Sequence, residues 1–278
     1  MLWLVVNSAS GSNDADAVAA LEEALRAAGA APDRTLDCAE ADLPDRAALE
    51  AAGVATLAIY TGDGTINALV PQLEGWGGGV LVLPGGTANL LAKELHGERD
   101  TAEIVAAFGA GALLPIQHPC IRSGVHTALI ELLAGPGAAW SDVREGLREG
   151  DLGTIASTTV EAVKQTAFGP AVTIGDPALG KAEGYAGVRL TPASGDIAVS
   201  GYGADSFGDY LKQGLALLKR DYREGPHDEL GHHPALTCQS LDGSAIVLMI
   251  DGERSQCPSP ARFELATLDV NLLAHGDG

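Results

Sequence analysis

Three unbroken apolar runs occur in the first third of the chain, and each ends in a polar segment that contains glycine. The runs are residues 2–6, 57–60 and 80–83. Continuous hydrophobicity over four or five residues is typical of strands that are buried on both faces of a parallel sheet. We therefore expect three inner strands of one parallel sheet.

A segment with helical character follows each of these runs. Apolar residues from Val18 to Ala28 recur at helical spacing, and Gly29 directly after them is a stop signal. Residues 66–73 and 90–96 follow the second and third runs, and a proline in the first of these segments is expected to bend or shorten its helix. Strands that alternate with helices predict a parallel, doubly wound α/β domain.

The pattern changes after about Pro115. Period-two alternation is clearest in residues 262–266 and 268–272, and shorter strand candidates are residues 171–174, 188–191, 197–200, 236–240 and 245–250. Helical pieces are expected at residues 140–148, 155–168 and 209–220. These features predict a second domain that is β-rich and sandwich-like. We place the α/β domain at residues 1–116 and the β-rich substrate domain at residues 117–267.

The composition excludes several classes of protein. A chain of 278 residues with 46% hydrophobic residues suits two globular domains. The formal net charge of −20 disfavours binding to nucleic acids and to bare anionic membranes, so membrane contact would be peripheral at most. The apolar start is too short for a signal peptide, and no apolar run is long enough to cross a bilayer. We expect a cytoplasmic protein, transiently membrane-associated at most, whose four cysteines are free thiols.

The three polar segments carry the candidate chemistry. Residues 7–11, 62–65 and 84–89 each lie where a predicted strand ends and a helix begins. In an open α/β sheet, ligands bind outside these carboxyl ends, where helix N-termini offer free N–H groups to phosphate. Glycine lets the backbone approach the ligand, while threonine hydroxyls and asparagine amides add further hydrogen bonds. We expect a phosphate-binding site.

Asp63 requires its own explanation, because a carboxylate beside phosphate is repelled unless a cation lies between them. A magnesium ion, bound directly or through water, would remove this repulsion. The structural alternative is an N-cap aspartate in a Gly-Asp-Gly turn. The residue pattern alone leaves both interpretations open.

Taken together, the three segments resemble the diacylglycerol kinase catalytic family, which includes sphingosine kinases and bacterial lipid kinases. The resemblance rests on Asn7–Gly11, Gly62–Asn67 and Pro84–Ala92, in this order and with a strand before and a helix after each. Near the other end of the chain, Asp251-Gly252-Glu253 is similar to the Asp-Gly-Glu segment of the family. Without the upstream motifs, this segment would predict only a hairpin turn.

The resemblance implies a fold, a reaction and a set of site residues. The first domain would bind ATP and magnesium, residues 268–278 would return to it, and the γ-phosphoryl group would pass to the hydroxyl of a diacylglycerol-like or sphingoid-like lipid. Asp63 would act with the metal and the phosphates, and Glu253 would be the general base. The nucleotide would be bound by Asn7, Ser10, Gly11, Gly62, Gly64, Thr65, Gly85, Gly86, Thr87 and Asn89. A homodimer is left open.

Three positions depart from the family pattern and keep alternatives open. Thr61 stands where the family has glycine, Ala68 where a glutamate is common, and Gln117 where an aspartate is common. A side chain at Thr61 is expected to narrow the approach to the nucleotide. The alternatives are a small-molecule kinase in the manner of NAD kinase and a nucleotide-binding regulatory pseudokinase.

Two further groups of residues could bind a ligand, but each has a simpler structural interpretation. His227, His232 and His233 with Cys238 match no strong zinc spacing, so we expect a solvated loop. The basic residues between Lys212 and Arg223 could meet phosphate or lipid headgroups, but they more often balance nearby acidic residues.

Overall fold

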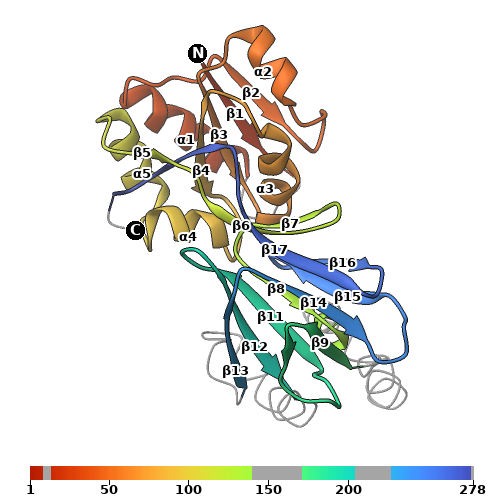
Figure 1. Cartoon of the computed structure of the whole chain (residues 1–278). Helices are drawn as coiled ribbons and strands as arrows, with labels where there is room; N and C mark the ends of the chain where they lie inside the picture. Colours follow the sequence, from red (N-terminus) through yellow and green to blue (C-terminus); the bar gives the residue numbers. More distant parts are fainter. Residues whose placement is uncertain (9–13, 140–170, 204–226, 277–278) are drawn as a thin grey trace, which may run out of the picture. The chain divides into compact units, whose positions relative to one another are not determined.

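The structure is a computed structural model that describes residues 1–8, 14–139, 171–203 and 227–276. Contacts divide the chain into unit 1, Met1–Pro119 with Thr267–Gly278, and unit 2, Cys120–Ala266 (Figure 1). The helices expected at residues 140–148, 155–168 and 209–220 lie outside the described residues, as do the basic residues between Lys212 and Arg223. Unit 1 is α/β and the described part of unit 2 is β-rich, which confirms the predicted fold class.

The sheet of unit 1 has six strands in the order β2-β1-β3-β4-β18-β5. All neighbouring pairs from β2 to β18 are parallel, and β5 is antiparallel to β18. The strands are β1 (Leu2–Val6), β2 (Arg34–Asp37), β3 (Thr56–Thr61), β4 (Gly79–Pro84), β5 (Leu114–Ile116) and β18 (Asn271–Ala274). The three inner strands expected from apolar runs are therefore adjacent in the sheet.

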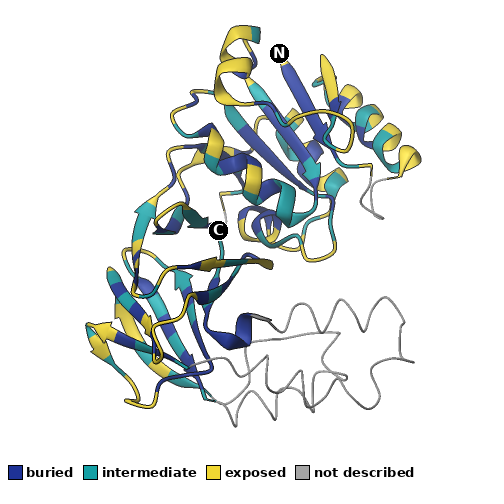
Figure 2. Cartoon of the chain, turned by 90° about the vertical axis from the view of Figure 1, so that its right-hand side faces the viewer, coloured by how far each residue is buried: buried dark blue, intermediate teal, exposed yellow. Residues whose placement is uncertain are grey.

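Helices cover the inner strands of unit 1, so β1 is buried along its whole length (Figure 2). Leu4 and Leu81 belong to a core cluster with Leu25 of α1 and Ile104 of α5. Side chains alternate between the two faces of a strand, and Val5 on the opposite face is also fully buried. The helices are α1 (Ala15–Ala27), α2 (Arg46–Ala52), α3 (Asp63–Leu69), α4 (Leu90–His96) and α5 (Thr101–Gly109).

Local signals explain where most of these helices begin and end. Asp14, Asp45 and Asp100 are N-caps whose carboxylates accept a backbone hydrogen bond from the first turns of α1, α2 and α5. The helix expected at residues 66–73 is divided into α3 and the 3₁₀ helix η1 (Val70–Leu73). Proline in the second position of η1 has no N–H for an α-helical hydrogen bond, so the predicted shortening is observed.

The described residues of unit 2 form two six-stranded sheets, in the orders β10-β9-β14-β17-β6-β7 and β13-β12-β11-β8-β15-β16. One buried cluster joins them, and it includes Phe263 from the first sheet and Leu248 from the second. The strands are β6 (Pro119–Ser123), β7 (His126–Ala128), β8 (Leu132–Ala134), β9 (Val172–Asp176), β10 (Ala178–Leu179), β11 (Gly187–Pro192), β12 (Ile197–Tyr202), β13 (Asp228–His233), β14 (Ala235–Ser240), β15 (Ile246–Ile250), β16 (Glu253–Cys257) and β17 (Ala261–Thr267).

The last strand of the chain belongs to unit 1. Alternation suggested a strand at residues 268–272, whereas β18 covers Asn271–Ala274 and pairs with β4 and β5. The N–H of Leu268 donates to the carbonyl oxygen of His118, so the chain re-enters unit 1 beside the point where it left. None of the described helices is long and apolar enough to span a bilayer.

Candidate functional site

The polar loops of unit 1 meet at one edge of its sheet. Strands β1, β3 and β4 are neighbours and run parallel, so the residues after Val6, Thr61 and Pro84 emerge side by side at their carboxyl ends. Ligands in open α/β sheets bind at this edge. The fold therefore brings together the loops after β3 and β4 and the first two residues of the loop after β1, whereas Ser10 and Gly11 lie outside the described residues.

The carboxylate of Asp63 joins two of these loops. One oxygen accepts a hydrogen bond from the N–H of Asn89 at 3.0 Å, and the other accepts from the N–H of Leu90 at 2.7 Å. Asp63 is the first residue of α3, but its side chain caps the beginning of α4. Because each carboxylate oxygen has a second lone pair, this arrangement leaves acceptor capacity for a further ligand.

Asn89 holds the loop before α4 in a closed turn. Its Oδ1 accepts from the N–H of Gly86 at 2.7 Å, and its Nδ2 donates to the carbonyl oxygen of Gly86 at 3.0 Å. Asn89 has a φ of 55°, in the left-handed region that asparagine tolerates better than most residues. The Asn89 amide is thus occupied by its own loop, while Thr87 at the loop's tip is exposed.

Two glycines are required because the loops after β3 and β4 approach so closely. A Cβ atom on Gly85 would lie 2.6 Å from the backbone nitrogen of Thr61, and one on Gly86 would lie 2.8 Å from the Cα of Gly62. In contrast, a Cβ on Gly62 would meet nothing within 4 Å. Gly85 and Gly86 are therefore explained by loop packing, whereas Gly62 borders open space.

The end of β2 adds a fourth loop that the sequence analysis missed. The Asp37 carboxylate accepts the N–H of Ser8 at 3.1 Å and the N–H of Ala39 at 3.0 Å, and a hydrogen bond from the Ser8 side chain is the main cause of its lowered pKa. Burial raises the pKa of Cys38, and a hydrogen bond with the Thr65 side chain opposes that rise. Four adjacent strand ends are thus tied together by polar contacts. Only Leu36 of β2 is buried, so no apolar run could have revealed this strand.

Two of the three departures from the family pattern, Thr61 and Gln117, have structural explanations. Thr61 is completely buried, and its hydroxyl donates to the carbonyl oxygen of Gly62 at 3.2 Å. Contrary to our expectation, its side chain therefore does not narrow the approach to the loops. Gln117 donates from Nε2 to the Asp269 carboxylate at 3.1 Å within unit 1. A second carboxylate in place of Gln117 would repel Asp269, whereas the amide is attracted to it.

The described residues test whether magnesium would fit this site. No group of three or more histidine, cysteine, aspartate or glutamate residues forms a metal cage in the described part of the chain. Magnesium, however, is usually bound by one or two carboxylates together with substrate phosphates and water. The half-buried carboxylate of Asp63, with its remaining lone pairs, fits that mode and not an all-protein cage.

Glu253 lies in unit 2, directly after a tight turn. Strands β15 and β16 form a hairpin in which Ile250 pairs with Glu253, and Asp251 and Gly252 between them both have positive φ. This confirms the hairpin expected from the Asp-Gly pair. Glu253 is exposed on this hairpin.

Asp251 holds the hairpin turn in place. Its carboxylate accepts three backbone hydrogen bonds, from Leu129 at 2.7 Å, Ile130 at 2.8 Å and Glu131 at 2.7 Å. Burial raises the pKa of Asp251 to about 6, although these N–H donors act in the opposite direction. The aspartate of the Asp-Gly-Glu segment therefore has a structural role, fixing the hairpin turn, which the sequence did not reveal.

The expectation of a solvated loop around the histidines considered as a metal site is wrong, because His232 and His233 belong to strand β13 and pair with β12. His227 lies against the ring of Tyr202, and a ring nitrogen of His233 hydrogen-bonds the carbonyl oxygen of Leu230. Cys238 is buried in β14, and burial raises its pKa to about 12. These contacts are structural.

The fold and site define a two-domain protein, in which an α/β unit with joined loops at its carboxyl edge is combined with a two-sheet β unit. Residues 1–118 match the family model described as the diacylglycerol kinase catalytic domain. The resemblance drawn from the three motifs is thereby confirmed for this part of the chain. No curated protein matches the chain significantly.

Solved structures extend the likeness to both units. A "putative diacylglycerol kinase" from Bacillus anthracis str. Sterne has 15% sequence identity and a TM-score of 0.62, with 99% of this chain and 95% of that chain covered. A structure described as a diacylglycerol kinase from the same organism has 16% identity and a TM-score of 0.60, with 99% and 97% covered. At these identities the likeness shows a shared fold and no more.

Proposed function

We propose that the chain is an ATP-dependent phosphotransferase that transfers the γ-phosphoryl group to a lipid hydroxyl, diacylglycerol-like or sphingoid-like. The match of residues 1–118 to a kinase catalytic domain supports a phosphotransferase. The acidic chain, with a net charge of −20, argues against nucleic acid as the acceptor and against strong attraction to anionic lipid surfaces. Contact with the membrane would then be peripheral.

The observation that carries this proposal is the bond network from Asp63 to the loop after β4. Phosphoryl transfer depends mainly on positioning and on neutralising charge, so the loops around the phosphates must be held in one geometry. The Asp63 carboxylate joins the beginnings of α3 and α4, while Gly85 and Gly86 let the two loops pack together. These contacts hold the two loops together at the edge where ligands of α/β sheets bind.

The site residues have distinct proposed roles. Gly62 borders open space, so the nucleotide could approach the backbone there, next to Gly64 and Thr65. Asn7, Ser10 and Gly11 would contact the nucleotide from the loop after β1. Gly85, Gly86, Thr87 and Asn89 would form the wall after β4, in which Thr87 offers the exposed hydroxyl. A magnesium ion, held by Asp63 directly or through water, would neutralise charge on the phosphates when bound.

Glu253 is proposed as the general base that takes the proton from the attacking lipid hydroxyl. Its exposed position beside a turn held by three hydrogen bonds to Asp251 supports a group that is both accessible and well positioned.

The test is a screen with radiolabelled ATP and magnesium across detergent-dispersed total lipid, purified diacylglycerol, sphingosine and NAD. We expect label in a lipid product and none in NAD. Label in NAD alone would contradict the lipid acceptor and favour a small-molecule kinase. The variant Glu253→Gln should lose transfer but keep ATP affinity, because a base acts on the acceptor and not on nucleotide binding.

A regulatory pseudokinase is the second candidate, and one observation favours it. Both oxygens of Asp63 already accept backbone hydrogen bonds, so a structural role is sufficient to explain an aspartate at this position. Calorimetry separates the two candidates: a pseudokinase would bind ATP without labelling any lipid in the extract, whereas the enzyme would do both.

A further inference from the structure

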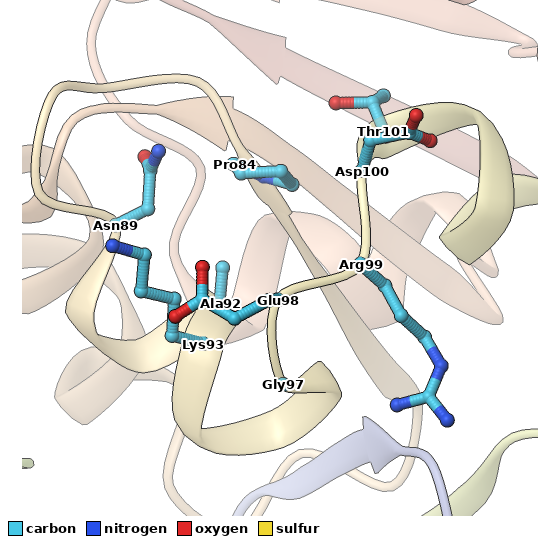
Figure 3. Close-up of a pocket in the computed structure, with 9 residues that line it drawn as sticks. All are labelled: Pro84, Asn89, Ala92, Lys93, Gly97, Glu98, Arg99, Asp100 and Thr101. Carbon is cyan, nitrogen blue, oxygen red and sulfur yellow. The ribbon is translucent and has the colours of Figure 1, made fainter.

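A cavity of about 290 Å³ lies directly beside the loop after β4 (Figure 3). It begins at Pro84 and Asn89, at the carboxyl edge of the sheet, and extends along α4 to the segment that leads into α5. All of its lining residues belong to unit 1. The cavity therefore extends the candidate phosphate site in one direction, past the end of β4.

Two cations line this cavity, Lys93 of α4 and Arg99 after it, and Lys93 is the one next to the loop after β4. Side chains on a helix are tilted toward its N-terminus, and Figure 3 shows the Lys93 chain extending toward Asn89. Among residues 1–8, 14–139, 171–203 and 227–276, none forms a hydrogen bond or ion pair with the Lys93 ammonium. The neighbouring Arg99 points away in Figure 3, and its Nη1 donates to the carbonyl oxygen of His96 at 2.7 Å.

The charge around the loops makes this lysine significant. Residues 7–13, 38–45, 62–69 and 85–89 contain neither lysine nor arginine, and they include the carboxylate of Asp63. A polyphosphate placed here would meet acidic side chains in a chain whose net charge is −20. A lysine at the rim whose ammonium has no partner among the described residues would offset part of that repulsion.

Glu98 shows that the cavity also carries a charge of the opposite sign. It lines the cavity together with Lys93, yet the two form none of the ion pairs found among the described residues. An anion bound by Lys93 would be repelled by Glu98. Loss of the Lys93 charge should therefore weaken the binding of an anion in this cavity, and loss of the Glu98 charge should strengthen it.

We propose that Lys93 binds the terminal phosphoryl group of a nucleoside triphosphate at the mouth of this cavity, with Glu98 opposing it. The inference rests on the proposed function, because it extends the same nucleotide site. It adds a residue that the loop motifs do not predict. The chemistry recognised is a phosphate dianion, which free phosphate or a phosphorylated lipid would also present.

The test is calorimetric titration of the full chain with ATP, ADP and inorganic phosphate, each with magnesium. Lys93→Gln should weaken ATP binding about 10-fold or more and leave ADP binding within about twofold, as loss of a charge-assisted hydrogen bond predicts. Glu98→Gln should tighten ATP binding by a few-fold. Arg26→Gln is the matched control, since it removes one positive charge from the last turn of α1, outside the cavity.

The possible outcomes are distinguishable. If the wild-type chain binds neither ATP nor ADP, the proposed function fails. If it binds both and Lys93→Gln binds ATP as tightly as the wild type does, only this inference is overturned. An equal loss for ATP and ADP would also overturn it, because Lys93 would then contact an inner phosphate. If the wild type binds inorganic phosphate but no nucleotide, and Lys93→Gln loses this binding, then the group that Lys93 recognises does not come from a nucleotide and the inference is overturned.

Discussion

Asp63 in unit 1 and Asp251 in unit 2 perform the same local task in very different surroundings. Each follows a strand, and each carboxylate accepts backbone N–H groups from a distant segment: two for Asp63 and three for Asp251. Asp251 is 2% exposed, whereas Asp63 is only partly buried. Asp251 is thus committed to the fold, while Asp63 retains access to a ligand. Burial, more than the hydrogen bonds, separates a structural carboxylate from a candidate catalytic one.

The largest effect is expected for Asp63→Asn. If the site acts as proposed, phosphoryl transfer should fall at least about 100-fold, since a charge at the reacting phosphates is lost. The amide can accept only one of the two N–H groups, so a loss of stability should accompany it. Initial rates and urea unfolding would be measured together. Asp45→Asn, which removes the same charge from the N-cap of α2, should retain activity.

Asp251→Ala should have the largest effect on stability. It removes the acceptor of three backbone N–H groups in a segment of which Leu129 is buried and the next two residues are partly buried, so the free energy of unfolding should fall by about 3 kcal/mol or more. Urea unfolding at pH 7 measures this. Asp242→Ala, in the exposed turn after β14, should lose less. Equal losses in the two variants would contradict the view that burial decides the cost.

Two glycines distinguish packing from ligand access within unit 1. Gly85→Ala should destabilise the chain by roughly 1–3 kcal/mol, because its Cβ would lie 2.6 Å from the Thr61 backbone nitrogen. Gly62→Ala should leave the unfolding free energy nearly unchanged but weaken ATP binding, since its methyl group would enter open space at the site. Thermal unfolding and calorimetry separate these effects. A normal ATP affinity in Gly62→Ala would argue against nucleotide approach at this point.

The smallest effect, a dependence on pH, should have opposite signs in the two units. Burial lowers the pKa of His96 in unit 1 to about 4, so the folded state loses stability as pH falls from about 6.5 to 4. His96 donates from Nε2 to the carbonyl oxygen of Val82, and its Nδ1 faces Nδ1 of His275 at 2.9 Å, where a second proton would bring two N–H groups together. Asp251, with its pKa raised to about 6, gains stability over the same fall in pH.

Urea unfolding of the wild type and His96→Gln at pH 7 and pH 4.5 tests whether unit 1 loses stability as the pH falls. The wild type should lose more stability than the variant between these pH values, because only the wild type carries the buried imidazole. Parallel losses would show that His96 is not the group responsible.

Much of the fold could be predicted from the chain alone because apolar runs and helical spacing are local properties. Strands β1, β3 and β4 were expected within one residue of their observed ends, and α4 was expected with its observed bounds. Strand β2 was not predicted, because an edge strand with one buried residue has no hydrophobic pattern. The strand expected at residues 268–272 begins three residues later, at Asn271.

The candidate site, like the fold, could be predicted from the sequence only in part. The sequence by itself determined which loops carry glycine, hydroxyl and carboxylate groups, because each loop follows an apolar strand at short range. Only the tertiary structure decided that Asp63 caps α4, that Asp37 and Thr65 tie neighbouring loops together, and that Lys93 faces the cavity beside them. These contacts join residues from different strand ends, and their partners depend on strand order, which no local pattern encodes.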